Sequence, residues 1–417
     1  MPEPTMLALT GDPLYTFATS RQYRVDPYPF LAGLRRTSPV HRSTAGFCLL
    51  TRYEDVARAL RDPALGTASV TDSPQDGAVA GIAEAIRRGV TRPVSALDPP
   101  EHGRVRRALA GAFPRDLFET LREPVERRVD ELLDGLPAGE VVDAVSALAL
   151  PLPLAVVCDL LGVPDRDREA LASWGSALAA NGDPGFLLAE EHRGAALRAE
   201  RDLGAYFGRL LVRRRHRPDG GPLAALIAAG DGTDRLAFHE LMANSAFLFV
   251  NGYHNTVNLI SLGLLALLRN PDQYARLGAE PDLAPAAVEE LLRFDSPIQS
   301  IARVARERYE VGGAVLPPGT QVMAMVGAAH RDPEAFEEPD RLDLGRRSSR
   351  RALSFGGGVH YCLGAAVARM EVEVLLRETA RRFPDLALAG APEWSSTFTL
   401  RGLDLLPVRL GKRRREG

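Results

Sequence analysis

Apolar residues recur every three or four positions through most of residues 53–296, and this period predicts helices separated by short polar or Pro/Gly breaks. A second helical run covers residues 362–382. The pattern therefore predicts a helical core made of these two parts. Within the first part we expect helices at about residues 102–112, 115–134, 142–162, 166–180 and 190–216.

Apolar and polar residues alternate in three shorter parts of the chain, which predicts β-rich regions at about residues 21–52, 297–328 and 385–410. A Pro-Pro-Gly turn separates two strand-like runs within the second of these regions. Residues 1–417 contain no internal repeat or low-complexity spacer. We expect a single domain that is mainly α with a smaller β-rich part.

Residues 236–270 contain no proline and predict one long helix of about 50 Å. The run is apolar nearly all round, which is typical of a membrane span or of a helix through the centre of a large domain. Asn251, His254, Asn255 and Asn258 lie in its middle, where lipid would penalise them heavily. We therefore expect a central buried helix, whose polar patch forms a hydrogen-bond network or lines a cavity.

Charge and cysteine content exclude several classes of function. The formal charge is -3, from 51 basic and 54 acidic residues, so no overall field favours nucleic acid or an anionic membrane. Three widely spaced cysteines argue against a disulfide framework or a zinc site. The first residues show neither the positive region nor the apolar run of a signal peptide. We expect a cytoplasmic protein that binds no membrane and no nucleic acid.

The strongest chemical signal is the segment FGGGVHYCLGAAVAR, residues 355–369. Cys362 follows a glycine-rich loop and opens a helix, where the helix dipole and free N–H groups favour a thiolate that can bind a metal. The glycines at 356, 357, 358 and 364 leave room for a flat, bulky group against the backbone. The alternative is a buried structural cysteine at a helix start.

The pattern Phe355-x-x-Gly358-x-His360-x-Cys362-x-Gly364 resembles the haem-binding signature of cytochromes P450, in particular the soluble bacterial and actinomycete type. The resemblance implies haem b (iron protoporphyrin IX) between the long central helix and the Cys-bearing helix. It also implies that the Cys362 thiolate is the proximal iron ligand. Phe355 would pack under the haem, His360 would hydrogen-bond a propionate, and both glycines of the pattern would belong to the cofactor site.

Glu290-Leu-Leu-Arg293, about 70 residues before Cys362, resembles the ExxR pair of the same family. Glutamate and arginine at i and i+3 share one helix face, and in the family they lock the core on the haem side. A surface ion pair is the alternative interpretation. Residues 339–345, PDRLDLG, resemble the segment that completes this network, with Arg341 as its third member.

Two further segments resemble haem-propionate anchors. Residues 98–113 resemble the start of the family's C helix, where His102 and Arg106 lie four positions apart on one helical face. Arg303 matches the arginine that reaches a second propionate from the strand after ExxR. Ordinary solvated charge is the alternative for each of the three.

The central helix departs from the family pattern. Most members carry Ala/Gly-Gly-x-Asp/Glu-Thr, whereas this chain reads Asn251-Gly252-Tyr253-His254-Asn255-Thr256. Gly252 is retained and would let the helix open beside the haem. His254 stands for the acid and Asn255 for the alcohol, and Thr256 follows one position later.

Three interpretations of this substitution remain open. His254 could shuttle protons, with Asn255 or Thr256 holding a water, and the enzyme would remain a monooxygenase. The substrate could instead supply the proton or be coupled without oxygen insertion. In the third interpretation the patch is structural only.

The substrate pocket is placed by analogy, at about residues 64–97 and 174–200 and at the residues named at the end of this paragraph. No charged anchor stands out, which favours a medium or large, partly apolar molecule. The expected pocket residues are Ala246, Phe249 and Val250 on the central helix, Ile298 and Ile301 near the following strand, and Thr397 and Phe398 at a late turn.

The resemblance implies a haem-thiolate monooxygenase of secondary metabolism, such as antibiotic biosynthesis, that oxidises a free or carrier-bound small molecule. Ferredoxin and ferredoxin reductase would supply electrons to a monomer, and Arg104 and Arg107 are candidates for contact with an acidic ferredoxin. One alternative is a P450 that catalyses oxidative C–C or C–O coupling or cyclisation without oxygen insertion. The other is a non-catalytic P450-fold protein that recruits partners.

Overall fold

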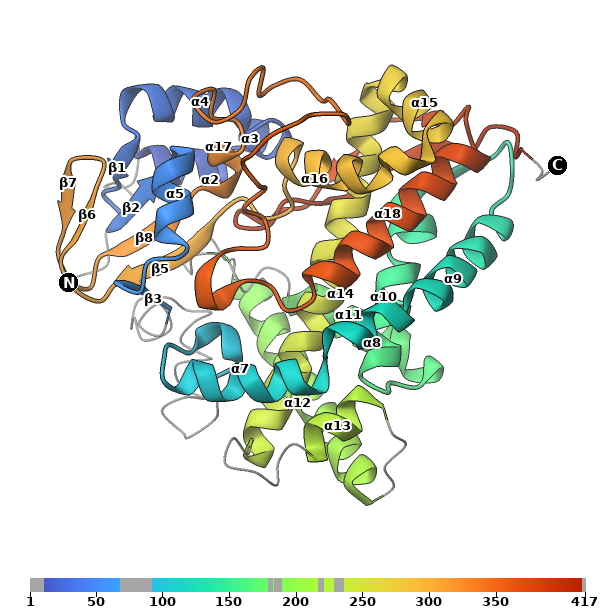
Figure 1. Cartoon of the computed structure of the whole chain (residues 1–417), viewed down its shortest axis with the longest axis horizontal. Coiled ribbons are helices and arrows are strands. Elements are labelled where there is room, and N and C mark those ends of the chain that lie inside the picture. Colours follow the sequence, from blue (N-terminus) through green and yellow to red (C-terminus); the bar gives the residue numbers. More distant parts are fainter. Residues whose placement is uncertain are drawn as a thin grey trace.

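The computed structural model describes residues 11–67, 92–178, 183, 190–216, 221–228 and 236–414. Helices dominate these residues, and strands β1, β2, β3, β5 and β8 with the β6-β7 hairpin lie beside the N-terminal helices at one end of the molecule (Figure 1). Among the described residues, no helix combines the length and apolar character needed to cross a membrane.

The long central helix is confirmed as α14 (Phe238–Arg269). Glu240 caps its start by accepting a hydrogen bond from the Ala237 N–H at 2.8 Å. Its second half is buried almost all round, with Ile260 and Leu262 fully enclosed. The helix runs through the middle of the molecule beside α18 (Ala365–Arg382), so the Cys-bearing end of α18 lies near its centre (Figure 1).

Other helices along the chain are α5 (Tyr53–Ala59), α7 (Glu101–Ala112), α8 (Arg115–Thr120), α9 (Arg122–Asp134), α10 (Pro151–Leu160), α11 (Arg168–Leu178), α12 (Glu190–His216), α13 (Pro222–Ala228), α15 (Pro271–Ala279), α16 (Ala284–Phe294) and α17 (Val326–Ala329).

The main sheet has five strands in the order β1-β2-β8-β5-β3, with β2 and β8 parallel and the other pairs antiparallel. The smaller sheets are β4-β12-β9, β6-β7 and β10-β11. The strands are β1 (Val40–Arg42), β2 (Phe47–Leu50), β3 (Leu65–Gly66), β4 (Val141–Asp143), β5 (Ile301–Ala305), β6 (Tyr309–Val311), β7 (Ala314–Leu316), β8 (Gln321–Ala324), β9 (Ala387–Leu388), β10 (Glu393–Trp394), β11 (Leu403–Leu405) and β12 (Pro407–Arg409).

The structure corrects the predicted β-rich region at residues 21–52, because its first half is helical. The chain forms α2 (Pro13–Thr19), α3 (Arg21–Val25) and α4 (Tyr28–Thr37) before the first strand. Leu31 and Leu34, three positions apart on α4, are buried in a core shared with the sheet, and this packing favours the helix.

Two predicted helices are also interrupted. Residues 115–134 divide into α8 and α9 at Leu121. Residues 142–162 begin with β4, followed by a π-helical turn, Val145–Ala149, and then α10. The Asp143 carboxylate accepts hydrogen bonds from the backbone N–H groups of Val145 and Ser146, which starts the turn directly after the strand.

Candidate active site

Cys362 lies in a tight loop immediately before α18. Its backbone N–H donates to the Phe355 carbonyl at 2.9 Å, which closes the loop. Gly356 and Gly358 have φ angles of 72° and 61°, in the left-handed region that disfavours other residues. The glycines predicted from the sequence are therefore needed for the shape of this loop.

Of the three cysteines, Cys48 and Cys158 are buried and Cys362 is accessible. Although the residue is exposed, protein atoms packed around its sulfur exclude part of the solvent and raise the pKa of the Cys362 thiol. The Gly364 N–H and the guanidinium groups of Arg106 and Arg369 act in the opposite direction. An anionic, iron-bound sulfur at this position would be stabilised by the same three groups.

Four basic side chains converge near Cys362, from α7, β5 and the cysteine loop. The rings of His102 and His360 lie 4.4 Å apart between centroids, and Arg106 donates to the Tyr361 carbonyl at 2.7 Å. Burial lowers the pKa of His360 to about 4 and also lowers that of His102. Arg303, which is 5% exposed, has its pKa lowered to about 10 by burial.

The carboxylate nearest this group is Asp98, whose Oδ1 lies 3.9 Å from His360 Nε2 and also accepts from the Thr67 N–H. Arg303 donates to its neighbouring Ala302 carbonyl. Burying a guanidinium without an ion pair is costly, so the group is suited to a ligand that brings carboxylates. The residues present fit the two propionates of a haem, with the Cys362 sulfur beside them.

The predicted pair Glu290 and Arg293 is deeply buried on α16, at 4% and 2% exposure. Arg293 Nε and Nη2 donate to the two carboxylate oxygens at 2.7 and 2.8 Å. Arg293 also donates to the backbone carbonyls of His330, Pro339 and Arg341. The pair is thus a two-point ion pair in the core, and the surface alternative is wrong.

The third member of this network is Arg346, which corrects the prediction of Arg341. Arg346 Nε lies 3.1 Å from both oxygens of Glu290. Arg341 contributes only its carbonyl, and its side chain is exposed and pairs with Glu338 at 3.0 Å. Because the matched segment ended at residue 345, the sequence resemblance stopped one residue short of the arginine that matters.

Only some of the polar side chains in the middle of α14 form hydrogen bonds with one another. Asn258 Nδ2 lies 3.4 Å from Nδ1 of His254, and since an amide nitrogen only donates, the imidazole accepts here. Burial lowers the pKa of His254. Asn255 Oδ1 is buried without a partner among the described residues, whereas Asn251 donates to the Phe247 carbonyl.

Gly252 and Thr256 have different surroundings. Thr256 is 4% exposed. A Cβ on Gly252 would lie 2.7 Å from Val157 Cγ2, so this glycine allows α10 to approach α14 closely. Its side faces an apolar neighbour, and a role in opening the helix beside a haem stays a prediction.

Two of the predicted pocket residues pack against other aromatic side chains. Phe249 is fully buried and packs between Phe207 and Tyr253, with ring centroids 6.0 and 5.3 Å away. Phe398 packs edge-on against Phe17 at 5.4 Å. Both rings therefore have aromatic neighbours, and their place in a substrate pocket stays a prediction.

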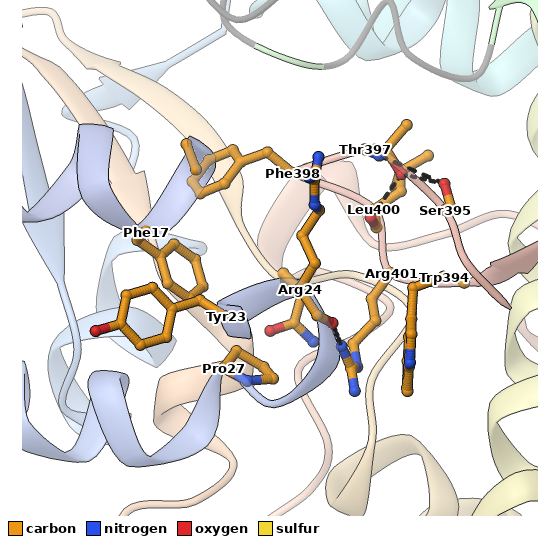
Figure 2. Close-up of a pocket in the computed structure, with 13 residues that line it drawn as sticks. Phe17, Tyr23, Arg24, Pro27, Trp394, Ser395, Thr397, Phe398, Leu400 and Arg401 are labelled. Atoms are coloured by element: carbon orange, nitrogen blue, oxygen red, sulfur yellow. Dashed lines mark hydrogen bonds between the residues drawn. The ribbon is translucent and has the colours of Figure 1, made fainter. Parts of the chain in front are cut away.

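The turn that carries Thr397 and Phe398 borders a cavity of about 360 Å³ beside the N-terminal helices (Figure 2). Arg401 lies 4.0 Å over the Trp394 ring there and donates to Asp295, so its charge is already compensated. Ala246, Val250, Ile298 and Ile301 are partly accessible. In the predicted variable segments, residues 68–91, 179–182 and 184–189 lie outside the described residues.

Two residues near the site carry no signal that sequence alone could reveal. Tyr253, 1% exposed, donates to the Ala172 carbonyl of α11 at 3.1 Å, and Arg369 stacks 4.3 Å over the Phe355 ring. Both terminal nitrogens of Arg104 bond Glu240 of α14, and a role for Arg104 in docking stays a prediction. Arg107 is exposed.

Comparison with known proteins agrees with this geometry. The family model for cytochrome P450 matches residues 211–387. The chain is 38% identical over 372 residues to cytochrome P450 107B1 of Saccharopolyspora erythraea, covering 87% of this chain and 89% of that protein. It is 37% identical to the 6-deoxyerythronolide B hydroxylase of the same organism, covering 94% and 98%.

A solved structure, the bacillaene polyketide synthase cytochrome P450 PksS of Bacillus subtilis 168, superposes with a TM-score of 0.84 and 32% identity, covering 94% of this chain and 99% of that one. The chain belongs to the cytochrome P450 family. It is a cytochrome P450 monooxygenase related to enzymes of polyketide and antibiotic biosynthesis, and its family uses haem-thiolate iron, redox partners and a small-molecule substrate.

Proposed function

We propose that this enzyme binds haem b through Cys362 and hydroxylates or otherwise oxidises a medium-to-large natural product. The observation that carries the proposal is the convergence of an accessible cysteine with four basic side chains that have too few carboxylates among the described residues. When bound, the haem iron supplies the activation of dioxygen. Relatives named 6-deoxyerythronolide B hydroxylase and polyketide biosynthesis cytochrome P450 PksS support the substrate class.

Different residues of the chain are proposed to contact different parts of this cofactor. His102, Arg106, Arg303 and His360 are proposed to bind the propionates, because charged donors hold carboxylates strongly in a buried setting. Phe355, held under the Arg369 guanidinium, is proposed to pack beside the sulfur. Gly358 and Gly364 keep the backbone of this loop free of side chains.

We propose that His254, Asn255 and Thr256 position water on the central helix. His254 is buried with a lowered pKa, so it is neutral near pH 7 and accepts at Nδ1. The partnerless Oδ1 of Asn255 can accept a hydrogen bond from water. Neither group is a ready acid, which keeps the second candidate open: coupling or cyclisation in which the substrate supplies its own protons.

Products formed under ¹⁸O₂ separate these two candidates. The first step is to find a substrate from a panel of macrolactones and other polyketides by its spin-state shift. We expect the product to carry one labelled oxygen atom and the other oxygen atom of dioxygen to leave as water. An unlabelled product that has two hydrogen atoms fewer than the substrate would instead establish the coupling reaction.

Electrons are proposed to come from a ferredoxin and its reductase, with a monomeric enzyme working in the cytoplasm on a free or carrier-bound substrate. Exposed Arg107 on α7 is one candidate contact for an acidic ferredoxin. Arg107→Glu should slow electron transfer and leave the substrate spin shift intact. Unchanged transfer would remove Arg107 from the docking site.

A further inference from the structure

Asn244 on α14 is an enclosed amide whose two polar atoms bond different parts of the chain. The residue is 0% exposed. Its Nδ2 donates to the Glu240 carbonyl one turn earlier on the same helix, at 2.9 Å. Its Oδ1 accepts from the Val94 N–H, also at 2.9 Å. The bond to its own helix therefore orients the amide, and the amide oxygen holds a segment that is 150 positions away in the sequence.

Val94 begins η2 (Val94–Ala96), a short 3-10 turn that precedes α7. Val94 is 5% exposed, so its N–H has little access to water. A buried N–H needs an acceptor, and the carbonyls in the middle of an α-helix such as α14 are taken by the helix's own hydrogen bonds. The Asn244 side chain supplies the oxygen instead. Without it the Val94 N–H would lose its partner, at a cost that favours movement of η2 toward water.

The residues that follow η2 have other partners. Thr67, which follows β3, donates to Asp98 Oδ1 through its N–H at 2.9 Å and through its hydroxyl at 3.2 Å. Arg104 of α7 pairs with Glu240 of α14. Loss of the amide contact would therefore release η2 and leave α7, with its propionate candidates, in place.

The contact joins two stretches that are both predicted to border the substrate. Residues 92–97, which include η2, are the described end of the first segment predicted for the pocket. On α14, the predicted pocket residues Ala246 and Val250 come two and six positions after Asn244, and both are partly accessible. One hydrogen bond between a side chain and the backbone thus connects the two sides of the predicted pocket.

We propose that Asn244 is a positioning residue for substrate selectivity, because its amide fixes the distance between η2 and α14 and so limits which molecules fit between them. The inference rests on the proposed function and deepens it for natural products of different bulk. When the amide is lost, η2 can move away from α14. Bulkier members of a substrate series should then gain affinity relative to the best substrate of the wild type.

The test compares holoenzymes of the wild type, Asn244→Leu, Asn244→Asp and the control Ser245→Ala. Leucine has nearly the shape of asparagine without its polar atoms, whereas aspartate still offers an acceptor to Val94. Ser245 is the next residue on α14, is also 0% exposed, and has no hydrogen bond at Oγ among the described residues. The control therefore changes a buried polar group of the same helix without touching η2.

Two readouts are needed. The first is hydrogen–deuterium exchange of the peptide that contains Val94, measured by mass spectrometry without substrate. The second is the ratio of two dissociation constants from spin-shift titrations, for the best substrate of the panel and for a bulkier analogue.

We expect Asn244→Leu to speed the exchange of the Val94 N–H by about tenfold and to shift the affinity ratio by about tenfold toward the bulkier analogue. Asn244→Asp should restore part of both effects, and Ser245→Ala should match the wild type. Exchange at the wild-type rate in Asn244→Leu, an unchanged affinity ratio, or a control that changes as much as Asn244→Leu would overturn the proposal. A general loss of stability would not shift the ratio.

The carbon monoxide spectrum, recorded first on every protein, separates this inference from the proposed function. If the wild type lacks the thiolate-shifted band, the proposed function fails and this inference falls with it. If all variants show that band and bind an azole normally, they are folded around their cofactor, and an unchanged affinity ratio then overturns the role of Asn244 alone.

Discussion

Individual side chains stabilise the part of the core around Glu290 to very different extents. Glu290 accepts hydrogen bonds from Arg293, from Arg346 and from the Asp343 N–H, so its carboxylate is fully compensated although it is buried. Arg341, inside the recognised segment, sends its side chain outward. Residues with the same charge, five positions apart, therefore make very different contributions to stability.

Replacing Arg346 by methionine tests this difference. The change removes two charge-assisted contacts to buried Glu290, and we expect it to lower the free energy of unfolding by about 2 kcal/mol. Arg341→Gln is the matched control and should cost less than about 0.5 kcal/mol. Urea unfolding of both variants gives the comparison. Equal losses would contradict the assignment of Arg346.

Buried histidines make stability depend on pH. Burial lowers the pKa of His330 to about 3 and that of His360 to about 4. Their unfolded pKa is near 6.5, so between pH 6.5 and 4 the unfolded chain binds more protons, and stability falls as the pH drops. Each histidine contributes a slope of about 1.4 kcal/mol per pH unit in that range.

Urea unfolding at a series of pH values checks this expectation in the wild type and in His330→Gln. Below pH 6.5, the free energy of unfolding of the variant should change less steeply with pH, by about the contribution of one histidine. A slope that does not change would mean that His330 is protonated in the folded protein. Its Nε2 accepts the Leu353 N–H at 2.6 Å, which requires an unprotonated nitrogen.

At the scale of elements, α11 is fitted to α14 by one tyrosine and one glycine. Tyr253 donates to Ala172, and a Cβ on Gly175 would lie 2.2 Å from the Tyr253 hydroxyl oxygen. The two helices approach this closely only because residue 175 has no side chain. This contact fixes the distance between α11 and the part of α14 that carries His254.

Gly175→Ala should therefore be destabilising by about 1–3 kcal/mol, the usual cost of overpacking. Gly204→Ala on α12, where a Cβ meets nothing within 4 Å, is the control and should stabilise by about 0.4–1 kcal/mol. Tyr253→Phe in the Gly175→Ala background should restore part of the loss, because the hydroxyl is the closest clash. Additive losses would argue against this contact.

For the whole molecule, period and spacing were enough to predict a mainly helical protein around one long central helix. Helix α14 was predicted within two residues at its start and one at its end, because thirty-odd residues without a breaker leave little choice. The region at residues 21–37 was not predicted, since short helices there depend on burial against a distant sheet.

The candidate site was predictable where chemistry follows a local motif. Cys362, Glu290 and Arg293 stand in such motifs, and the structure brings them and the propionate candidates to the expected elements. The roles of Arg346 and Tyr253 depend on contacts made across the fold, which a local motif does not reveal. The aromatic packing of Phe249 and Phe398 could not be predicted, because sequence does not tell which way an aromatic side chain turns.

The claim on which everything else depends is that Cys362 binds haem iron as a thiolate. The direct measurement is the absorption spectrum of purified protein, reduced under carbon monoxide, for the wild type and for Cys362→Ala, with buried Cys158→Ala as control. We expect the red-shifted Soret band in the wild type and in the control and its loss in Cys362→Ala. A wild type without haem, or with haem but no shifted band, would contradict the assignment.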